Sequence, residues 1–198
     1  MKMLPTLLAN ANNYSKDVSH MADGQKPHTL FIACIDSRVI PNELLDTAEG
    51  EMLVVRNIAN QMDLAAIEFS MSKNCESIIV CGHFACGGIS VALGEDCLSA
   101  VDDHVRPIRK LWKKHSRLIR NQPMVLEWLN VLSTVKDICK IPIVRKKLEY
   151  NSVQVCGMYF DIKESKIIPL TVVSSLAQAR SFNIEDEIKL LLDNLEDH

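Results

Sequence analysis

The stretch SIIVCGHFACGG (residues 77–88) decides the fold, because a short apolar run passes directly into polar and small residues. The branched residues at its start predict a buried β-strand. His83 follows that strand at once, and Cys86 comes three residues later. The glycine pair after Cys86 opens a stretch of helical period. The segment therefore predicts a strand, a tight turn and a helix, with two metal-binding residue types in the turn.

Similar apolar runs recur on both sides of this stretch and alternate with helical periods. Predicted strands cover residues 29–34, 52–55, 77–82, a strand over 153–160 that is split at Gly157, and 167–173; predicted helices cover 64–72, 87–92 and most of 98–140, with breaks at Pro107 and Pro123. Strands that alternate with helices indicate an α/β fold with a mostly parallel central β-sheet flanked by helices. Pro169 places the last strand at a sheet edge, because proline has no N–H to donate to a ladder.

Two terminal segments extend this core, and we expect residues 1–198 to form a single domain. Residues 1–24 have helical period and end at a glycine, which predicts an N-terminal helical arm. Residues 25–175 are the predicted α/β core. Residues 183–198 place leucines and isoleucines on one helical face among acids, which predicts a C-terminal helix used for packing or for contact between chains.

Composition narrows the function classes. The net charge is −3 and basic residues are scattered apart from the run Arg106 to Arg120, so we do not expect nucleic-acid binding. We expect neither a membrane span, for which the apolar runs are too short, nor a secretory signal, so the predicted location is the cytoplasm. The seven cysteines are odd in number and irregularly spaced, which favours reduced thiols that bind metal, catalyse or fill the core.

Four of the polar residues fall where two strands end. Cys34 ends one predicted strand with Asp36 two residues on, and His83 follows another strand with Cys86 three residues on. Ligand sites in open α/β sheets form beyond the carboxyl ends of strands. Two thiolates, one imidazole and one carboxylate can complete a tetrahedral zinc site. The residues alone leave this reading open, because buried cysteines and a hydrogen-bonded histidine fit the same pattern.

Three linked stretches resemble the signature stretches of the β-carbonic anhydrases, in the same order: CIDSRV (34–39), GEMLVVRN (50–57) and IVCGHFACGG (79–88). The resemblance is strong over residues 25–93 and looser over residues 98–170. It implies that Cys34, His83 and Cys86 bind Zn²⁺ and that Asp36 and Arg38 form a dyad beside the metal. It also implies that Gln25, in the sequence GQKP, is a polar residue of the substrate pocket.

The resemblance further implies reversible hydration of CO₂ to bicarbonate and a proton, by attack of zinc-bound hydroxide. A bidentate ion pair from Arg38 would keep Asp36 off the metal, whereas an unpaired Asp36 would be a possible fourth ligand. Two alternatives stay open, namely the same fold acting on CS₂ or COS and a non-catalytic zinc protein that acts through partners. The family usually assembles as dimers or larger, with the arm over a neighbour, so we expect a homo-oligomer.

The chain departs from plant-like members of the family in a shortened loop at residues 58–64. We expect Leu53 and Ile58 to form the remaining apolar wall of the substrate pocket, with Gly87 and Gln25 as further substrate-binding residues. An apolar wall suits CO₂, which is small and has no dipole.

A second departure concerns regulation. Members that bind bicarbonate at a non-catalytic site tend to have Trp, Gly and Tyr where this chain has Phe31, Ala33 and Phe160. The hypothesis is that this protein lacks that site and keeps its zinc open. Arg56, at the end of a strand, is expected to anchor the loop at residues 46–50. Cysteines outside the zinc set are assigned to the core or surface, and a proton-shuttle role for His28 or His104 is a guess.

Overall fold

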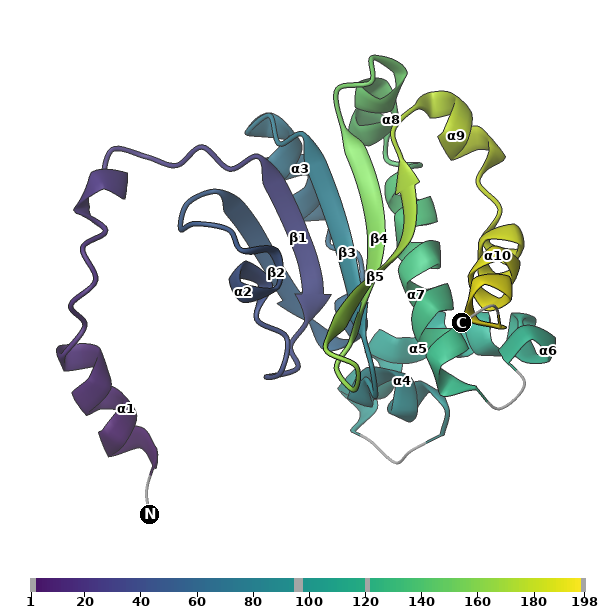
Figure 1. The fold of residues 1–198 in the computed structure, drawn as a ribbon, viewed down its shortest axis with the longest axis horizontal. Coiled ribbons are helices and arrows are strands. Elements are labelled where there is room, and N and C mark those ends of the chain that lie inside the picture. The colour runs from purple at the N-terminus through teal and green to yellow at the C-terminus, as the bar shows by residue number, and fades with distance from the viewer. Residues whose placement is uncertain (1–2, 95–97, 120–121, 197–198) are drawn as a thin grey trace.

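A five-stranded sheet forms the centre of the computed structural model, which describes residues 3–94, 98–119 and 122–196 (Figure 1). The strands are β1 (Thr29–Cys34), β2 (Met52–Asn57), β3 (Ser77–His83), β4 (Gln154–Asp161) and β5 (Lys166–Val173), in the spatial order β2-β1-β3-β4-β5. The first four strands are parallel, and β5 pairs with β4 in the antiparallel direction. The predicted α/β fold with a mostly parallel sheet and a C-terminal edge strand is confirmed.

Helices connect and cover these strands. They are α1 (Met3–Asn12), α2 (Pro41–Leu45), α3 (Leu64–Ser72), α4 (Gly87–Ala92), α5 (Ser99–Lys114), α6 (Ser116–Ile119), α7 (Pro123–Ile138), α8 (Pro142–Glu149), α9 (Leu176–Ser181) and α10 (Ile184–Glu196), with 3-10 turns η1 (Ser19–Met21) and η2 (Ile58–Asn60). Sequence analysis did not predict α2, α8 or α9, because five to eight residues are too few to display a helical period. Within the described residues, no helix is both long and apolar enough to cross a bilayer.

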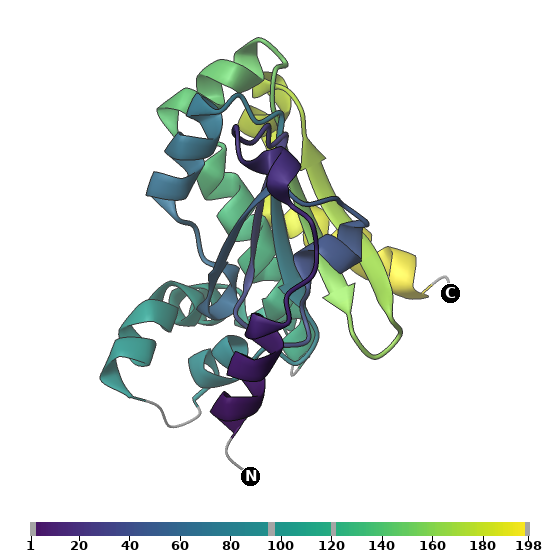
Figure 2. The ribbon, with the colours of Figure 1, turned by 90° about the vertical axis from the view of Figure 1, so that its left-hand side faces the viewer.

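The two faces of the sheet are covered unequally. Leu30, Ile32 and Cys34 of β1 point into the main core, where α7 packs against β3 and β4. Phe31 and Ala33 point to the other face, into a smaller cluster that includes residues of α2. This alternation follows from the two-residue period of a strand. Figure 2 shows the strands nearly edge-on, with α3, α5 and α8 together on one side.

The N-terminal arm differs from its prediction. Helix α1 ends at Asn12, and the rest of the arm is irregular apart from η1, so the prediction of a helix through residue 24 is wrong. Asparagine and serine between residues 10 and 19 explain the difference, because their side chains compete with the helix for backbone hydrogen bonds. Every residue of α1 is exposed, and the helix stands apart from the rest of the molecule in Figure 1.

Other boundaries shift by smaller amounts. Pro107 lies inside α5 and does not break it, because Val105 and Ile108 beside it are buried and their packing offsets the lost hydrogen bond. Strand β4 is continuous, and its register shift falls between Gly157 and Met158 where a split was predicted. The predicted C-terminal helix is present as α10, and residues 197–198 of that prediction lie outside the described residues.

Candidate metal centre

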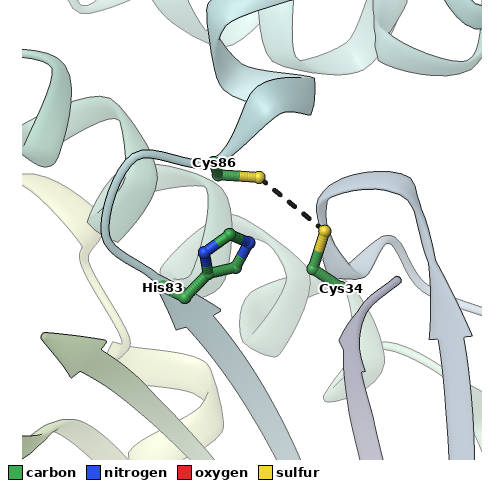
Figure 3. Close-up of side chains that lie close together, drawn as sticks. All are labelled: Cys34, His83 and Cys86. Carbon is green, nitrogen blue, oxygen red and sulfur yellow. Dashed lines mark hydrogen bonds between the residues drawn. The ribbon is translucent and has the colours of Figure 1, made fainter. Parts of the chain in front are cut away.

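Cys34, His83 and Cys86 meet at the carboxyl ends of β1 and β3 (Figure 3). Their ligand atoms all lie within 4.8 Å of one another, and all three side chains are buried. The two sulfur atoms are 3.9 Å apart. Two sulfurs bound to one tetrahedral zinc, each at about 2.3 Å, would be about 3.8 Å apart, so this separation fits the ion.

The orientation of the His83 ring supports the same fit. Its Nδ1 donates to the backbone oxygen of Phe84 at 3.0 Å, which leaves Nε2 with a free lone pair. That Nε2 is buried and has no hydrogen-bond partner among the described residues. A buried polar atom without a partner is costly, and a metal ion would satisfy it. The donor set of two thiols and one imidazole is one that zinc prefers.

The hydrogen bond between the two cysteines shifts their pKa values in opposite directions. The hydrogen bond from Cys86 lowers the pKa of Cys34 to about 4, although burial opposes this shift. The same contact, together with burial, raises the pKa of Cys86. Burial pulls the pKa of His83 down, but the negative charges of Cys34 and Asp36 nearby outweigh it, so the pKa is raised. A divalent cation binds cysteine as the thiolate, so its binding would displace the proton between the two sulfur atoms and leave both cysteines deprotonated.

Asp36 lies beside this group and is held by Arg38. The Nε and Nη2 atoms of Arg38 donate to the two carboxylate oxygens at 2.9 and 2.8 Å, and the backbone N–H of Arg38 donates to Oδ1 at 3.0 Å. These bonds hold the pKa of Asp36 well below its usual range. The nearer carboxylate oxygen is 3.9 Å from His83 Nδ1. The carboxylate therefore faces Arg38 at the border of the ligand group.

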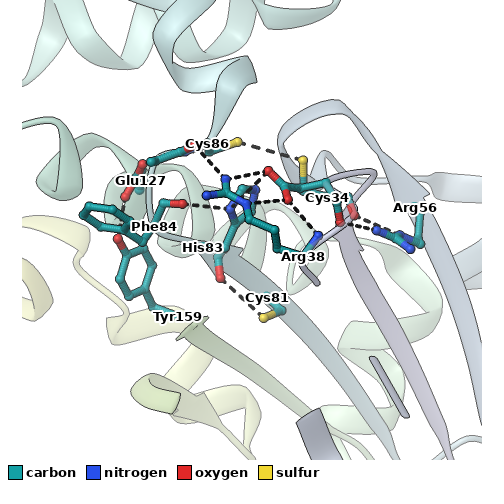
Figure 4. Close-up of polar contacts among 12 residues, drawn as sticks. Cys34, Arg38, Arg56, Cys81, His83, Phe84, Cys86, Glu127 and Tyr159 are labelled. Carbon is teal, nitrogen blue, oxygen red and sulfur yellow. Dashed lines mark hydrogen bonds and ion pairs between the residues drawn. The ribbon is translucent and has the colours of Figure 1, made fainter. Parts of the chain in front are cut away.

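Arg56 holds the loop that carries Asp36. Its Nε donates to the backbone oxygen of Cys34 at 2.9 Å, and its Nη2 donates to the backbone oxygen of Asp36 (Figure 4). The prediction that Arg56 anchors the loop at residues 46–50 is wrong. The parallel register explains why, since Arg56 pairs with Ala33 and its side chain reaches the end of β1.

The shortened loop begins at Ile58 and is tightly held. Ala59 and Asn60 both have positive φ, of 58° and 48°, which side chains other than glycine seldom adopt. Asn130 Nδ2 donates to the Ala59 oxygen at 2.9 Å, and His104 Nε2 donates to the Ile58 oxygen at 2.9 Å. His104 therefore anchors this loop, whereas the other shuttle candidate, His28, lies at the opposite end of the sheet.

The expected substrate-binding residues separate into two groups. Ile58 follows β2 at the metal end of the sheet, and Gly87 is the exposed first residue of α4, directly after Cys86. Leu53 lies four residues before the end of β2, a distance of roughly 13 Å along a strand, and Gln25 precedes β1 at the opposite end. The structure does not bring Leu53 or Gln25 to the metal group of the same chain, because strand direction places them away from it.

Sequence analysis missed two residues next to the ligands, Glu127 and Tyr159. Glu127 accepts hydrogen bonds from the Cys86 N–H at 3.0 Å and from the Tyr159 hydroxyl at 2.6 Å. Burial raises the pKa of Glu127, and these two donors oppose the shift. The sequence does contain a signal for Glu127, since it is the single charged residue in the apolar run MVLEWLNVL (124–132), and a lone charge in such a run needs a specific partner.

Known proteins resemble this chain in sequence and in fold. The sequence model of the carbonic anhydrase family matches residues 29–167, which include all three candidate ligands. The chain belongs to the carbonic anhydrase family. A crystal structure of tetrameric β-carbonic anhydrases from Sordaria macrospora matches with a TM-score of 0.74 and 27% identity, and covers 84% of this chain and 91% of that chain. The resemblance to the β class is confirmed.

Curated relatives agree with this assignment. A carbonic anhydrase of Emericella nidulans is 30% identical over 77% of this chain and 73% of its own length. A carbonic anhydrase of Candida albicans is 34% identical over 70% of this chain, which spans 54% of that protein. This β-carbonic anhydrase is therefore a member of a lyase family. Cys75, Cys81 and Cys139 are buried in its core as expected, and Cys97 lies outside the described residues.

Proposed function

We propose that this β-carbonic anhydrase catalyses the reversible hydration of CO₂ with a zinc ion held by Cys34, His83 and Cys86. The observation that carries the proposal is the buried, unpartnered Nε2 of His83 facing two thiols 3.9 Å apart. When bound, zinc lowers the pKa of a coordinated water towards about 7 and so supplies a nucleophile at neutral pH.

Asp36 and Arg38 orient the reaction in this proposal. Arg38 occupies both carboxylate oxygens, so Asp36 stays outside the ligand group and the fourth metal position stays open to water. The free lone pairs of the carboxylate can still accept a hydrogen bond from the attacking water. That bond would aim the lone pair of the water at the carbon of CO₂. Asp36 remains ionised throughout the working pH range, because Arg38 depresses its pKa.

The pocket wall and the assembly follow from the same geometry. Ile58 and Gly87 would face CO₂ beside the metal, and solvent buffer would carry the proton away. Gln25 can reach a metal group only from another chain, since it lies at the wrong end of its own sheet. We therefore propose a homo-oligomer, and the solved Sordaria macrospora relatives are described as tetrameric. A light-scattering mass equal to one chain would contradict the oligomer.

Stopped-flow CO₂ hydration by zinc-loaded protein tests the proposed reaction. Wild type should accelerate hydration, Cys86→Ala should lose both zinc and rate, and Asp36→Asn should retain zinc with a lower rate. Equal rates for protein and buffer would contradict the proposal. Faster turnover of CS₂ or COS than of CO₂ would favour the second substrate class. A zinc site that stays closed by Asp36 at alkaline pH would favour a non-catalytic protein.

We also propose that the non-catalytic bicarbonate site is absent. Phe31, Ala33, Val39 and Phe160 pack together in the smaller apolar cluster, and burial of an anion among apolar side chains is unfavourable. Arg56 is engaged by two backbone oxygens. A crystal structure at acidic pH with bicarbonate at Arg56 and Asp36 on the metal would contradict this. A cytoplasmic location is likewise proposed, because free thiol ligands need a reducing compartment, and cell fractionation tests it.

A further inference from the structure

Glu127 is a charged side chain in an apolar place. It is the fifth residue of α7, between residues that pack into the main core, and only 4% of its surface is exposed. No other aspartate or glutamate is buried among the residues that the structure describes. Burying a carboxylate costs several kcal/mol unless hydrogen bonds compensate. The contacts of Glu127 therefore indicate what the protein gains from it.

The Glu127 carboxylate is the acceptor in two hydrogen bonds. The backbone N–H of Cys86 donates to Oε1 at 3.0 Å, and the hydroxyl of Tyr159 donates to Oε2 at 2.6 Å (Figure 4). An acceptor-only carboxylate suits such a setting. Tyr159 is itself fully buried and packs edge-on against Trp128, with ring centroids 6.0 Å apart. One carboxylate oxygen is thus tied to the core, and the other holds the metal loop.

The loop between His83 and Cys86 needs such support. Ala85 has a φ of 52°, a left-handed conformation that is unfavourable for a residue with a Cβ. Arg38 Nη2 donates to the Ala85 oxygen at 3.2 Å on one side. Glu127 binds the next backbone N–H, that of Cys86, on the other side. The single peptide group between Ala85 and Cys86 is therefore held at both its oxygen and its N–H by two charged side chains.

Close packing of α7 on β3 fixes the position of Glu127 relative to this turn. Gly82 is the register partner of Tyr159, and a Cβ on Gly82 would lie 2.6 Å from a methyl group of Val131. Helix α7 can approach β3 this closely only because residue 82 has no side chain. This close approach places the Glu127 carboxylate within hydrogen-bond distance of the Cys86 N–H.

We propose that Glu127 is a positioning residue that holds Cys86 at ligating distance before the metal ion arrives. The proposal rests on the proposed zinc site and assigns Glu127 no contact with metal or substrate. Its carboxylate acts through the Cys86 peptide, and Tyr159 keeps the carboxylate in place. Loss of the acceptor would let the turn relax away from its left-handed conformation, which would separate the Cys86 sulfur from Cys34 and His83.

Zinc affinity and a cobalt spectrum of the full chain test this role. Glu127→Met removes the acceptor at similar side-chain length, and Glu127→Gln keeps an oxygen for the Cys86 N–H. Thr134→Val is the matched control, because it removes a different buried hydrogen bond of α7, from Thr134 to the Asn130 oxygen. Competition with a chromophoric chelator measures zinc affinity, and Co²⁺ substitution reports thiolate coordination by charge-transfer absorption.

Glu127→Met should bind zinc about 10–100-fold more weakly than wild type and shift the cobalt charge-transfer band. Glu127→Gln should restore much of the affinity, and Thr134→Val should leave affinity and spectrum unchanged. Affinity and spectrum of Glu127→Met equal to those of Thr134→Val would overturn the proposal. Should Glu127→Met fail to fold, Tyr159→Phe decides, since weaker zinc binding supports the proposal and unchanged binding overturns it. A wild type without zinc would refute the proposed function itself, which separates the two failures.

Discussion

Arg38 performs two tasks with one guanidinium group. It holds both oxygens of Asp36 and also donates to the Ala85 oxygen in the turn between two candidate ligands. A planar fork of several donors makes this possible, and the single ammonium of a lysine does not offer it. In the proposed zinc site, the state of the fourth metal position would therefore depend on Arg38, a side chain outside the ligand group.

Replacing Arg38 should close the metal site. In Arg38→Ala, the freed Asp36 can move onto zinc, so CO₂ hydration should fall about 10–100-fold while zinc content persists. Arg38→Lys is the matched variant, and it should recover little activity because it keeps the charge but loses the bidentate geometry. Stopped-flow rates with zinc analysis on the same samples measure both. Full activity in Arg38→Ala would show that Asp36 needs no restraint.

At the scale of elements, α4 packs against the shortened loop through one glycine. A Cβ on Gly88 would lie 2.7 Å from Ile58 Cγ2 and 2.9 Å from Ala59 Cβ, whereas a Cβ on Gly87 would meet nothing within 4 Å. Adjacent glycines thus have different roles. The second permits close contact between helix and loop, and the first leaves open space at the start of α4.

Alanine at these two positions should therefore give opposite results. Gly88→Ala should destabilise the protein by about 1–3 kcal/mol, because the loop is pinned by hydrogen bonds and cannot retreat freely. Gly87→Ala should cause no loss of stability, since helix propensity favours alanine. Urea unfolding of both variants with wild type measures the difference. Equal stability of the two variants would contradict the close packing.

Stability at mildly acidic pH should depend on His115, at the end of α5. His115 is buried, its Nδ1 lies 3.4 Å from Glu185 Oε1 on α10, and Lys114 is its charged neighbour. Burial and then Lys114 lower its pKa, while Glu185 opposes them. The unfolded chain takes up a proton at the ordinary value of 6.5 but the folded protein resists, so stability is lost as pH falls below that value.

Urea unfolding from pH 7.5 to pH 5 measures this contribution. The free energy of unfolding of wild type should fall more steeply with decreasing pH than that of His115→Gln, whose side chain does not titrate. Parallel pH dependences for the two proteins would show that His115 does not contribute.

Particular residues show how far sequence alone could lead. The meeting of Cys34 and His83 was predictable, because parallel strands bring their carboxyl ends to one edge of a sheet. That these two residues bind a metal together with Cys86 was implied by the resemblance to the β-carbonic anhydrases. The hydrogen-bond partners of Arg56 could not be predicted from the sequence, because they depend on the register between β1 and β2. Glu127 was missed because its role needs the position of α7 over Cys86, a contact between residues 41 positions apart in the chain.

At the scale of the whole molecule, the second half of the arm contacts its own chain, where Lys16 pairs with Glu49, but helix α1 is fully exposed. Helix α1 has no buried residue, and the exposed apolar side chains include Met3, Leu4, Leu7 and Leu8. Exposed apolar residues gathered on one short helix indicate a contact between chains. The exposed helix therefore agrees with the homo-oligomer proposed above.

Removal of the arm should weaken assembly. A chain lacking residues 1–24 should show a smaller mass in light scattering than the full chain, because it loses the apolar surface of α1. The double variant Leu7→Ser, Leu8→Ser should shift the mass in the same direction while retaining the rest of the arm. Unchanged mass in both variants would exclude the arm from the interface.

X-ray absorption at the zinc edge, on protein with measured zinc content, tests the central claim most directly. We predict one zinc per chain with two sulfur neighbours at about 2.3 Å and two lighter neighbours near 2.0 Å, one from His83 and one from water. The first shell should be unchanged in Asp36→Asn and lost with the metal in Cys86→Ala. Zinc-free wild type, or a shell in Asp36→Asn that has lost a neighbour, would contradict the account.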